Sequence, residues 1–184
     1  MKRIPLVISL ISVLVLPSCS SSKTSFNVPT SSERLGGWDK VKWGDSRELV
    51  QKKYPEATLK RTSTGTDPLV LRRIDIGEPS DYEALFHFMN NRLWCVILTD
   101  KSATGFEHLQ EYKALRTKFS QKHGAPIIDN REQWYSKDKI TALRVSSWKG
   151  VNIEILLSHY GIKNLNDEST IEIIYSSPAQ KAQL

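Results

Sequence analysis

The chain has 184 residues, of which 39% are hydrophobic, 9% aromatic and 25% charged, and its formal net charge is +6. This profile fits one ordinary domain with enough apolar material for a core, and it excludes collagen, coiled coils and wholesale disorder. The 2 cysteines cannot form the disulfide framework of a small secreted domain, so we expect packing to stabilise the fold.

The amino-terminal residues have the pattern of an export signal. Lys2 and Arg3 give a positive start, and an uncharged apolar run of about eleven residues follows at 6–16. This run is shorter than the ~20 residues that a membrane-spanning helix needs. Residues 1–18 are therefore predicted to be a cleaved signal peptide.

The signal ends in Leu16-Pro17-Ser18-Cys19, which resembles the lipobox of bacterial lipoproteins. In that family an aliphatic residue stands at −3, a small residue at −1 and the modified cysteine at +1. The resemblance implies a diacylglycerol on the Cys19 sulfur, cleavage before Cys19, and acylation of the new amino terminus by a fatty acid such as palmitate. Several acyl chains hold a protein firmly on a membrane, whereas one chain binds only marginally. The alternative is an ordinary secretory signal that ends at a cysteine by coincidence.

The residue after the lipobox bears on localisation. Position +2 is Ser20 and not aspartate, which by resemblance to enterobacterial sorting implies the outer membrane, with the domain facing the periplasm. Loss of Lys2 and Arg3 with the signal would leave a mature net charge of +4. The remaining basic residues are scattered among acidic ones, so we expect neither nucleic acid nor nucleotide as a partner.

The mature chain divides into three parts. Residues 19–37 are rich in Ser, Thr, Pro and Gly without a sustained period, which predicts a lipidated flexible tether. Residues 38–178 are predicted to form a single domain, and residues 179–184 a disordered tail. We assign no site to the tether.

The first half of the domain predicts a helix followed by strands. Residues 38–44 alternate apolar and polar side chains, which is typical of a half-buried extended segment. Asp45 and Glu48 have capping-box spacing ahead of a short helix, with Leu49, Val50 and Tyr54 on one face and Pro55 at its end. Strands are predicted at 69–76, 82–89 and 93–99, and a tight hairpin at Asn90-Asn91.

The second half repeats this order. Thr104 and Glu107 have capping-box spacing, and apolar residues recur every three to four positions down a helix that ends at Gly124. Strand-like runs follow at 132–136, 140–148, 151–158 and 170–175. The sequence therefore predicts an α+β fold. We expect an antiparallel β-meander sheet packed against two helices, with the possibility of two helix-then-strands halves.

A resemblance covers residues 38–176. Its features are Trp38-x4-Trp43-Gly44, Val50 and Tyr54, Arg92-Leu93-Trp94-x-Val96, Lys122-x-Gly124-x-Pro126, and finally Trp134 and Tyr175. These resemble a family of small bacterial envelope lipoproteins and secreted domains, mostly of unknown function. The order of elements is also similar to β-lactamase-inhibitor-like modules and to small lipoproteins that accompany outer-membrane β-barrel assembly. This second resemblance carries function only by analogy and transfers no catalytic residue.

The side chains that could carry chemistry form no strong motif. The histidines are His87, His108, His123 and His159, and only His108 has a carboxylate, Glu111, at helical spacing without a second pair of metal ligands. The chain has no G-x-S-x-G elbow, phosphate-binding loop or Rossmann glycine pattern. We therefore expect no catalytic, cofactor-binding or metal site. A hydrolase assembled from His87 or His159 and distant carboxylates remains an alternative.

Two further features concern surfaces. Cys95 is left alone once Cys19 is lipidated, and period-two alternation places it with Leu93 and Ile97, which predicts a buried, unreactive thiol. An intermolecular disulfide is the alternative. Among the five tryptophans, Trp134 together with Tyr135 is the pair that we single out as a possible binding surface.

These observations favour a lipid-anchored, non-catalytic protein of the bacterial envelope, held on the membrane by its lipid. Its domain would bind another envelope protein or serve as an accessory to an envelope complex. The alternative is an inhibitor or ligand- or glycan-binding module that acts on a secreted hydrolase or the cell wall.

Overall fold

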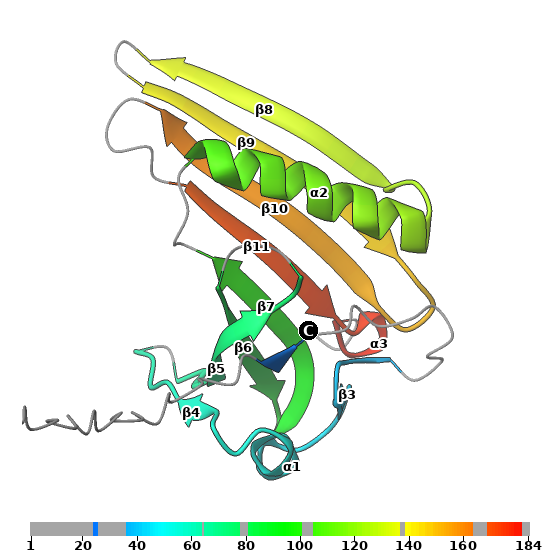
Figure 1. Cartoon of the computed structure of the whole chain (residues 1–184). Helices are drawn as coiled ribbons and strands as arrows, with labels where there is room; N and C mark the ends of the chain where they lie inside the picture. Colours follow the sequence, from blue (N-terminus) through cyan, green and yellow to red (C-terminus); the bar gives the residue numbers. More distant parts are fainter. Residues whose placement is uncertain are drawn as a thin grey trace, which may run out of the picture.

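The computed structural model describes residues 24–25, 36–63, 65–77, 81–100, 105–136, 139–163 and 169–181. The predicted signal peptide, Cys19 and residues 182–184 lie outside these ranges. Figure 1 shows one twisted sheet with a long helix lying along one of its faces.

Nine strands of the described residues form the main sheet, in the order β1-β5-β6-β7-β11-β10-β9-β8 with β4 beside β5. All neighbours pair antiparallel except β1 and β5. The strands are β1 (Thr24–Ser25), β4 (Thr58–Leu59), β5 (Leu69–Asp75), β6 (Tyr82–Met89), β7 (Arg92–Asp100), β8 (Ile128–Ser136), β9 (Lys139–Lys149), β10 (Glu154–Lys163) and β11 (Ser169–Ser176).

The remaining elements complete two helix-then-strands halves. Strands β2 (Gly37–Trp38) and β3 (Val41–Lys42) form a small second sheet ahead of α1 (Arg47–Lys53). Helix α1 precedes β4 to β7, and α2 (Gly105–His123) precedes β8 to β11. The last strand of each half, β7 and β11, lie side by side in the middle of the sheet, and a final turn, α3 (Pro178–Lys181), follows. The predicted α+β fold is confirmed.

Both longer helices pack on the same face of the main sheet, which we call the covered face. Helix α2 lies along β9, β10 and β11 (Figure 1). The Phe119 ring of α2 is 5.3 Å from the Trp148 ring and 6.3 Å from that of Tyr175. At the other end, the Tyr54 ring after α1 is 5.3 Å from the ring of Phe86. All of these side chains belong to one buried cluster, which therefore joins the two halves.

The amino-terminal cap of α1 differs from the prediction. Ser46, and not Asp45, is the cap, because the Ser46 hydroxyl accepts a hydrogen bond from the Leu49 amide at 3.3 Å. The Asp45 carboxylate instead accepts from the Lys42 amide at 2.9 Å and pairs with Lys53 at 2.6 Å. This one-residue shift leaves Leu49 40% exposed, although we expected it on the buried face.

The hairpin between β6 and β7 forms where it was predicted. Asn90 and Asn91 have φ angles of 51° and 59°, in the left-handed region that asparagine tolerates in a tight turn. The prediction for the strand that follows was wrong for Leu93. The register shifts between His87 and Phe88, so Phe88 pairs with Leu93, His87 pairs with Cys95, and Trp94 is the extra residue. Leu93 therefore joins the core cluster while Cys95 and Ile97 lie on the opposite face.

Three strand boundaries also differ from the sequence pattern. Strand β8 starts at Ile128, before the polar stretch that concealed it, and β10 runs from Glu154 to Lys163 and not from 151 to 158. In the predicted tether, Thr24 and Ser25 pair with Ile74 and Asp75 of β5. These two residues of the tether therefore have secondary structure.

Candidate functional site

The face of the main sheet on which neither α1 nor α2 packs carries a continuous line of apolar side chains. We call this side the uncovered face, and the line the apolar row. Direct pairing across six strands links its members, with Ser147 of β9 standing between the last two: Val70, Leu85, Ile97, Ile174, Leu156 and Ile128. Directly paired residues point to the same side of a sheet, so these side chains share one face.

The middle of the apolar row is only partly shielded from water. Leu85, Ile97, Ile174 and Leu156 are half-buried, and Ile128 is 46% exposed. Val70, at the far end of the row, is buried. The accessible part of the row thus extends from β6 to β8.

Polar side chains border the apolar row on both sides. One neighbouring line runs through paired residues His87, Cys95, Ser176, Glu154 and Lys149, and its last two side chains form an ion pair at 3.5 Å. The other line consists of Glu83, Thr99, Glu172 and Ser158. An apolar centre with a polar rim is the arrangement of a protein interface.

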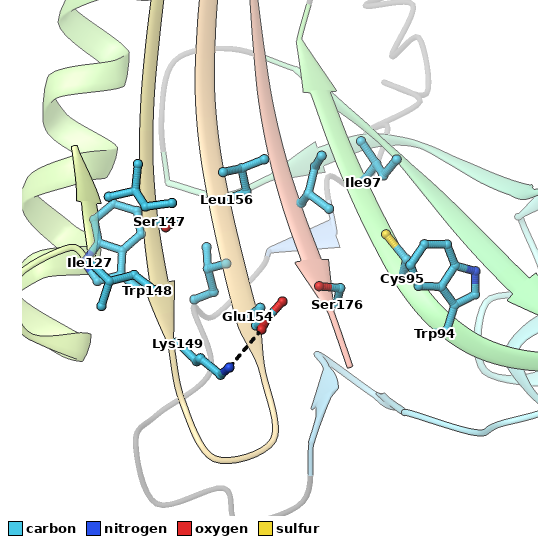
Figure 2. Close-up of a pocket in the computed structure, with 13 residues that line it drawn as sticks. Trp94, Cys95, Ile97, Ile127, Ser147, Trp148, Lys149, Glu154, Leu156 and Ser176 are labelled. Carbon is cyan, nitrogen blue, oxygen red and sulfur yellow. Dashed lines mark ion pairs between the residues drawn. The ribbon is translucent and has the colours of Figure 1, made fainter. Parts of the chain in front are cut away.

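Part of the row lines a shallow groove with a volume of about 470 Å³. Figure 2 shows Ile97 and Leu156 along it, with Trp94 at one end and Ile127 at the other. The Lys149–Glu154 ion pair closes its lower side in this view. Ile127 is 66% exposed, so the groove opens toward the sheet edge at β8. The groove offers an apolar surface in which a partner side chain can be desolvated.

Two of the predicted candidates lie beside this groove. Cys95 is 2% exposed, which confirms the prediction of a buried thiol. His87, its cross-strand neighbour, is half-buried, and burial lowers the pKa of its imidazole. Its Nε2 atom has no hydrogen-bond partner among the described residues. Neither side chain is next to a carboxylate in a printed contact, so the pair lacks the third group of a catalytic relay.

His159 lies on the covered face, away from His87. Its Nδ1 atom is 3.2 Å from the Arg144 guanidinium, and its Nε2 atom is 2.9 Å from the Ser169 hydroxyl. Because a guanidinium only donates, Nδ1 is the acceptor and Nε2–H donates to Ser169. Burial, followed by Arg144 and His108, lowers the pKa of His159 to about 4. This polarity is opposite to that of a base that takes a proton from serine.

A second polar cluster lies under the first half of α2. His108 is fully buried with its Nε2 atom 3.1 Å from Asp100, and Glu111, one turn further along, accepts a hydrogen bond from Tyr82 at 2.7 Å. The spacing of His108 and Glu111 was visible in the sequence, but Asp100 was not part of that pattern. His123 ends α2 as predicted, and burial together with Lys122 lowers its pKa.

The predicted surface pair cannot be placed in the same way. Trp134 and Tyr135 belong to β8, where they pair with Thr141 and Ile140, but their side chains lie outside the described residues. The apolar row was not predicted. Its signal was present as apolar side chains on both alternating faces of one strand, for instance Ile155, Leu156 and Leu157.

Among the described residues, no helix has the length and hydropathy needed to cross a bilayer. No family model, curated protein or solved structure matches the chain.

Proposed function

We propose that the chain is a lipid-anchored protein of the bacterial envelope that binds another envelope protein through the apolar row, without catalysing a reaction itself. The observation that carries this proposal is the row of half-buried apolar side chains, bordered by polar lines, on the face that neither α1 nor α2 covers. A folded chain gains nothing from leaving such side chains in contact with water, whereas a partner that removes the water gains free energy.

The anchor part of the proposal depends on the lipobox ending at Cys19. Lipidation there would restrict the domain to a membrane surface, and Ser20 favours the outer membrane with the domain in the periplasm. Intact-mass measurement of the native amino terminus tests this step. The expected result is an acylated chain that starts at Cys19, and a Cys19→Ser variant that stays unlabelled by palmitate analogues. A mature chain with another first residue contradicts the anchor.

The binding part is supported by the geometry of the groove. Its apolar walls come from four neighbouring strands, so its shape is fixed by the sheet and does not depend on a loop. Rigid apolar surfaces of this kind lose little conformational entropy when a partner docks. Lys149 and Glu154 at its rim add charges that a partner can pair.

Co-purification from crosslinked membranes tests the binding part. We compare the wild type with Leu156→Lys, which puts a charge in the middle of the apolar row, and with Lys113→Glu as a matched control. Lys113 is exposed on α2, on the other side of the sheet. The expected result is a stoichiometric partner that Leu156→Lys loses and Lys113→Glu keeps. A partner retained equally by both variants, or no partner with the wild type, contradicts the proposal.

A further inference from the structure

Three metal-binding side chains meet on the covered face, far from the apolar row. Asp100 ends β7, and His108 and Glu111 lie one turn apart on α2. Their exposed fractions are 0%, 0% and 6%. One ligand atom from each of the three lies within 4.8 Å of the others.

We propose that Asp100, His108 and Glu111 bind a divalent transition-metal ion, with Zn²⁺ as the ion that the donor set fits best. One imidazole and two carboxylates form a mixed nitrogen and oxygen set, which Zn²⁺ accepts readily. Mg²⁺ and Ca²⁺ prefer oxygen ligands alone. This inference concerns a different face from the proposed binding function and does not depend on it.

The first argument is the state of the His108 ring. Its Nε2 atom faces Asp100 at 3.1 Å, while its Nδ1 atom is buried without a hydrogen-bond partner. If the ring is neutral, Nε2–H donates to Asp100 and the Nδ1 lone pair is unused. If it is charged, Nδ1–H is buried without an acceptor. A metal ion removes the problem, because one nitrogen then binds the ion in place of a proton.

The second argument is charge. Two carboxylates with at most 6% exposure lie within a few ångströms of one another, and their negative charges repel in the low-dielectric interior. A protonated His108 offsets one of them. A divalent cation offsets both at once and needs no buried proton.

The third argument is geometry. Two ligand atoms bound at about 2.0 Å to a tetrahedral ion stand about 3.3 Å apart, close to the 3.1 Å between His108 and Asp100. The third ligand has to move inward by a small side-chain rotation, since the separation within the group reaches 4.8 Å. The Tyr82 hydroxyl, 2.7 Å from Glu111, would orient that carboxylate in the way that outer hydrogen bonds orient metal ligands.

Zinc analysis of the full-length protein in detergent tests the site. The protein is stripped with a chelator, refolded with Zn²⁺ because the ligands are buried, and dialysed before its zinc content is measured. The expected result is one zinc ion per chain, with a midpoint of thermal unfolding that rises with Zn²⁺ but not with Mg²⁺. A protein without bound zinc after this treatment overturns the proposal.

Variants separate this site from other zinc-binding groups. His108→Gln should lose stoichiometric zinc, and Tyr82→Phe, which deletes only a hydroxyl, should weaken the affinity by about 10–100-fold. His87→Gln is the matched control, because it removes another histidine with an unpartnered ring nitrogen from the opposite face, and it should retain zinc. Unchanged zinc affinity in both His108→Gln and Tyr82→Phe contradicts the site.

Folding of the variants is checked separately. Asp100→Asn keeps the shape of the side chain but removes its charge, so it should fold and lose the zinc-dependent rise in thermal stability. If Asp100→Asn lowers stability while zinc changes neither it nor the wild type, the cluster is a hydrogen-bonded network alone, and the proposal is wrong.

Discussion

The two faces of the main sheet use the same strands for different purposes. On β10, Ile155 and Leu157 point to the covered face and are at most 2% exposed, while Leu156 between them is half-buried on the uncovered face. On β11, Ile173 and Ile174 differ in the same way. Apolar content therefore does not distinguish the faces, but the helices do.

This difference separates stability from binding. Side chains under α1 and α2 have already left water when the chain folds, so they stabilise the fold and have nothing further to give a partner. Side chains of the apolar row keep part of their contact with water until a partner arrives. We therefore expect substitutions on the covered face to change the free energy of unfolding, and substitutions on the uncovered face to change association.

The largest expected effect tests the covered face. Phe119 of α2 is 1% exposed and contacts Trp148 and Tyr175. Phe119→Ala should lower the free energy of unfolding by about 3–5 kcal/mol, because it removes a buried ring and leaves a cavity. Urea denaturation followed by circular dichroism measures this loss. A loss under about 1 kcal/mol would mean that α2 does not hold the core.

The next effect concerns the neutral histidine under α2. The pKa of His159 is lowered to about 4 in the fold, mainly by burial, against 6.5 as its ordinary value. Between these values the unfolded chain binds a proton that the folded chain does not. Stability is thus full above pH 6.5 and falls as the pH drops toward 4, by roughly 2–3 kcal/mol.

Urea denaturation at pH 7.5 and pH 4.5 measures this change. His159→Gln is the control, since its amide can accept from Arg144 and donate to Ser169 without titrating. The wild type should lose more stability than His159→Gln on acidification. Equal losses in the two proteins would show that His159 titrates normally in the fold.

A smaller effect on stability is expected from the uncovered face. Leu156→Lys should lower the free energy of unfolding by about 1 kcal/mol or less, because its side chain already contacts water. The same substitution should abolish partner recovery. A stability loss as large as that of Phe119→Ala would erase the distinction between the faces.

The smallest effect is expected at the edge between the faces. Arg116 of α2 pairs with Asp129 of β8, with 3.0 Å from Nε to Oδ1, and both side chains are over a third exposed. Arg116→Ala should cost less than about 1 kcal/mol, and this cost should shrink at about 1 M NaCl. A salt-independent loss would indicate that Arg116 acts through packing of its aliphatic chain.

Local features of the fold could be predicted from the sequence. The Asn90-Asn91 turn and the helix at 105–123 follow from short patterns, and they formed where expected. The face of Leu93 was mispredicted because a β-bulge shifts the alternation by one residue at Trp94. Nothing in the local pattern marks this extra residue.

Long-range features could not be predicted in this way. The pairing of β7 with β11 joins residues more than seventy positions apart, and it is this pairing that completes the apolar row. The meeting of Asp100 with His108 and Glu111 depends on where α2 crosses the sheet, which helical spacing alone does not determine. The sequence showed the members of both clusters but not their proximity.

Photo-crosslinking in intact cells tests the central claim most directly. A photoreactive amino acid is placed at Ile128 or Leu156 on the uncovered face, and at Lys113 or Thr117, which are exposed on α2. The account predicts one discrete protein adduct from both uncovered-face positions and none from α2. Adducts of the same partner from α2 alone, or from neither face, would contradict it.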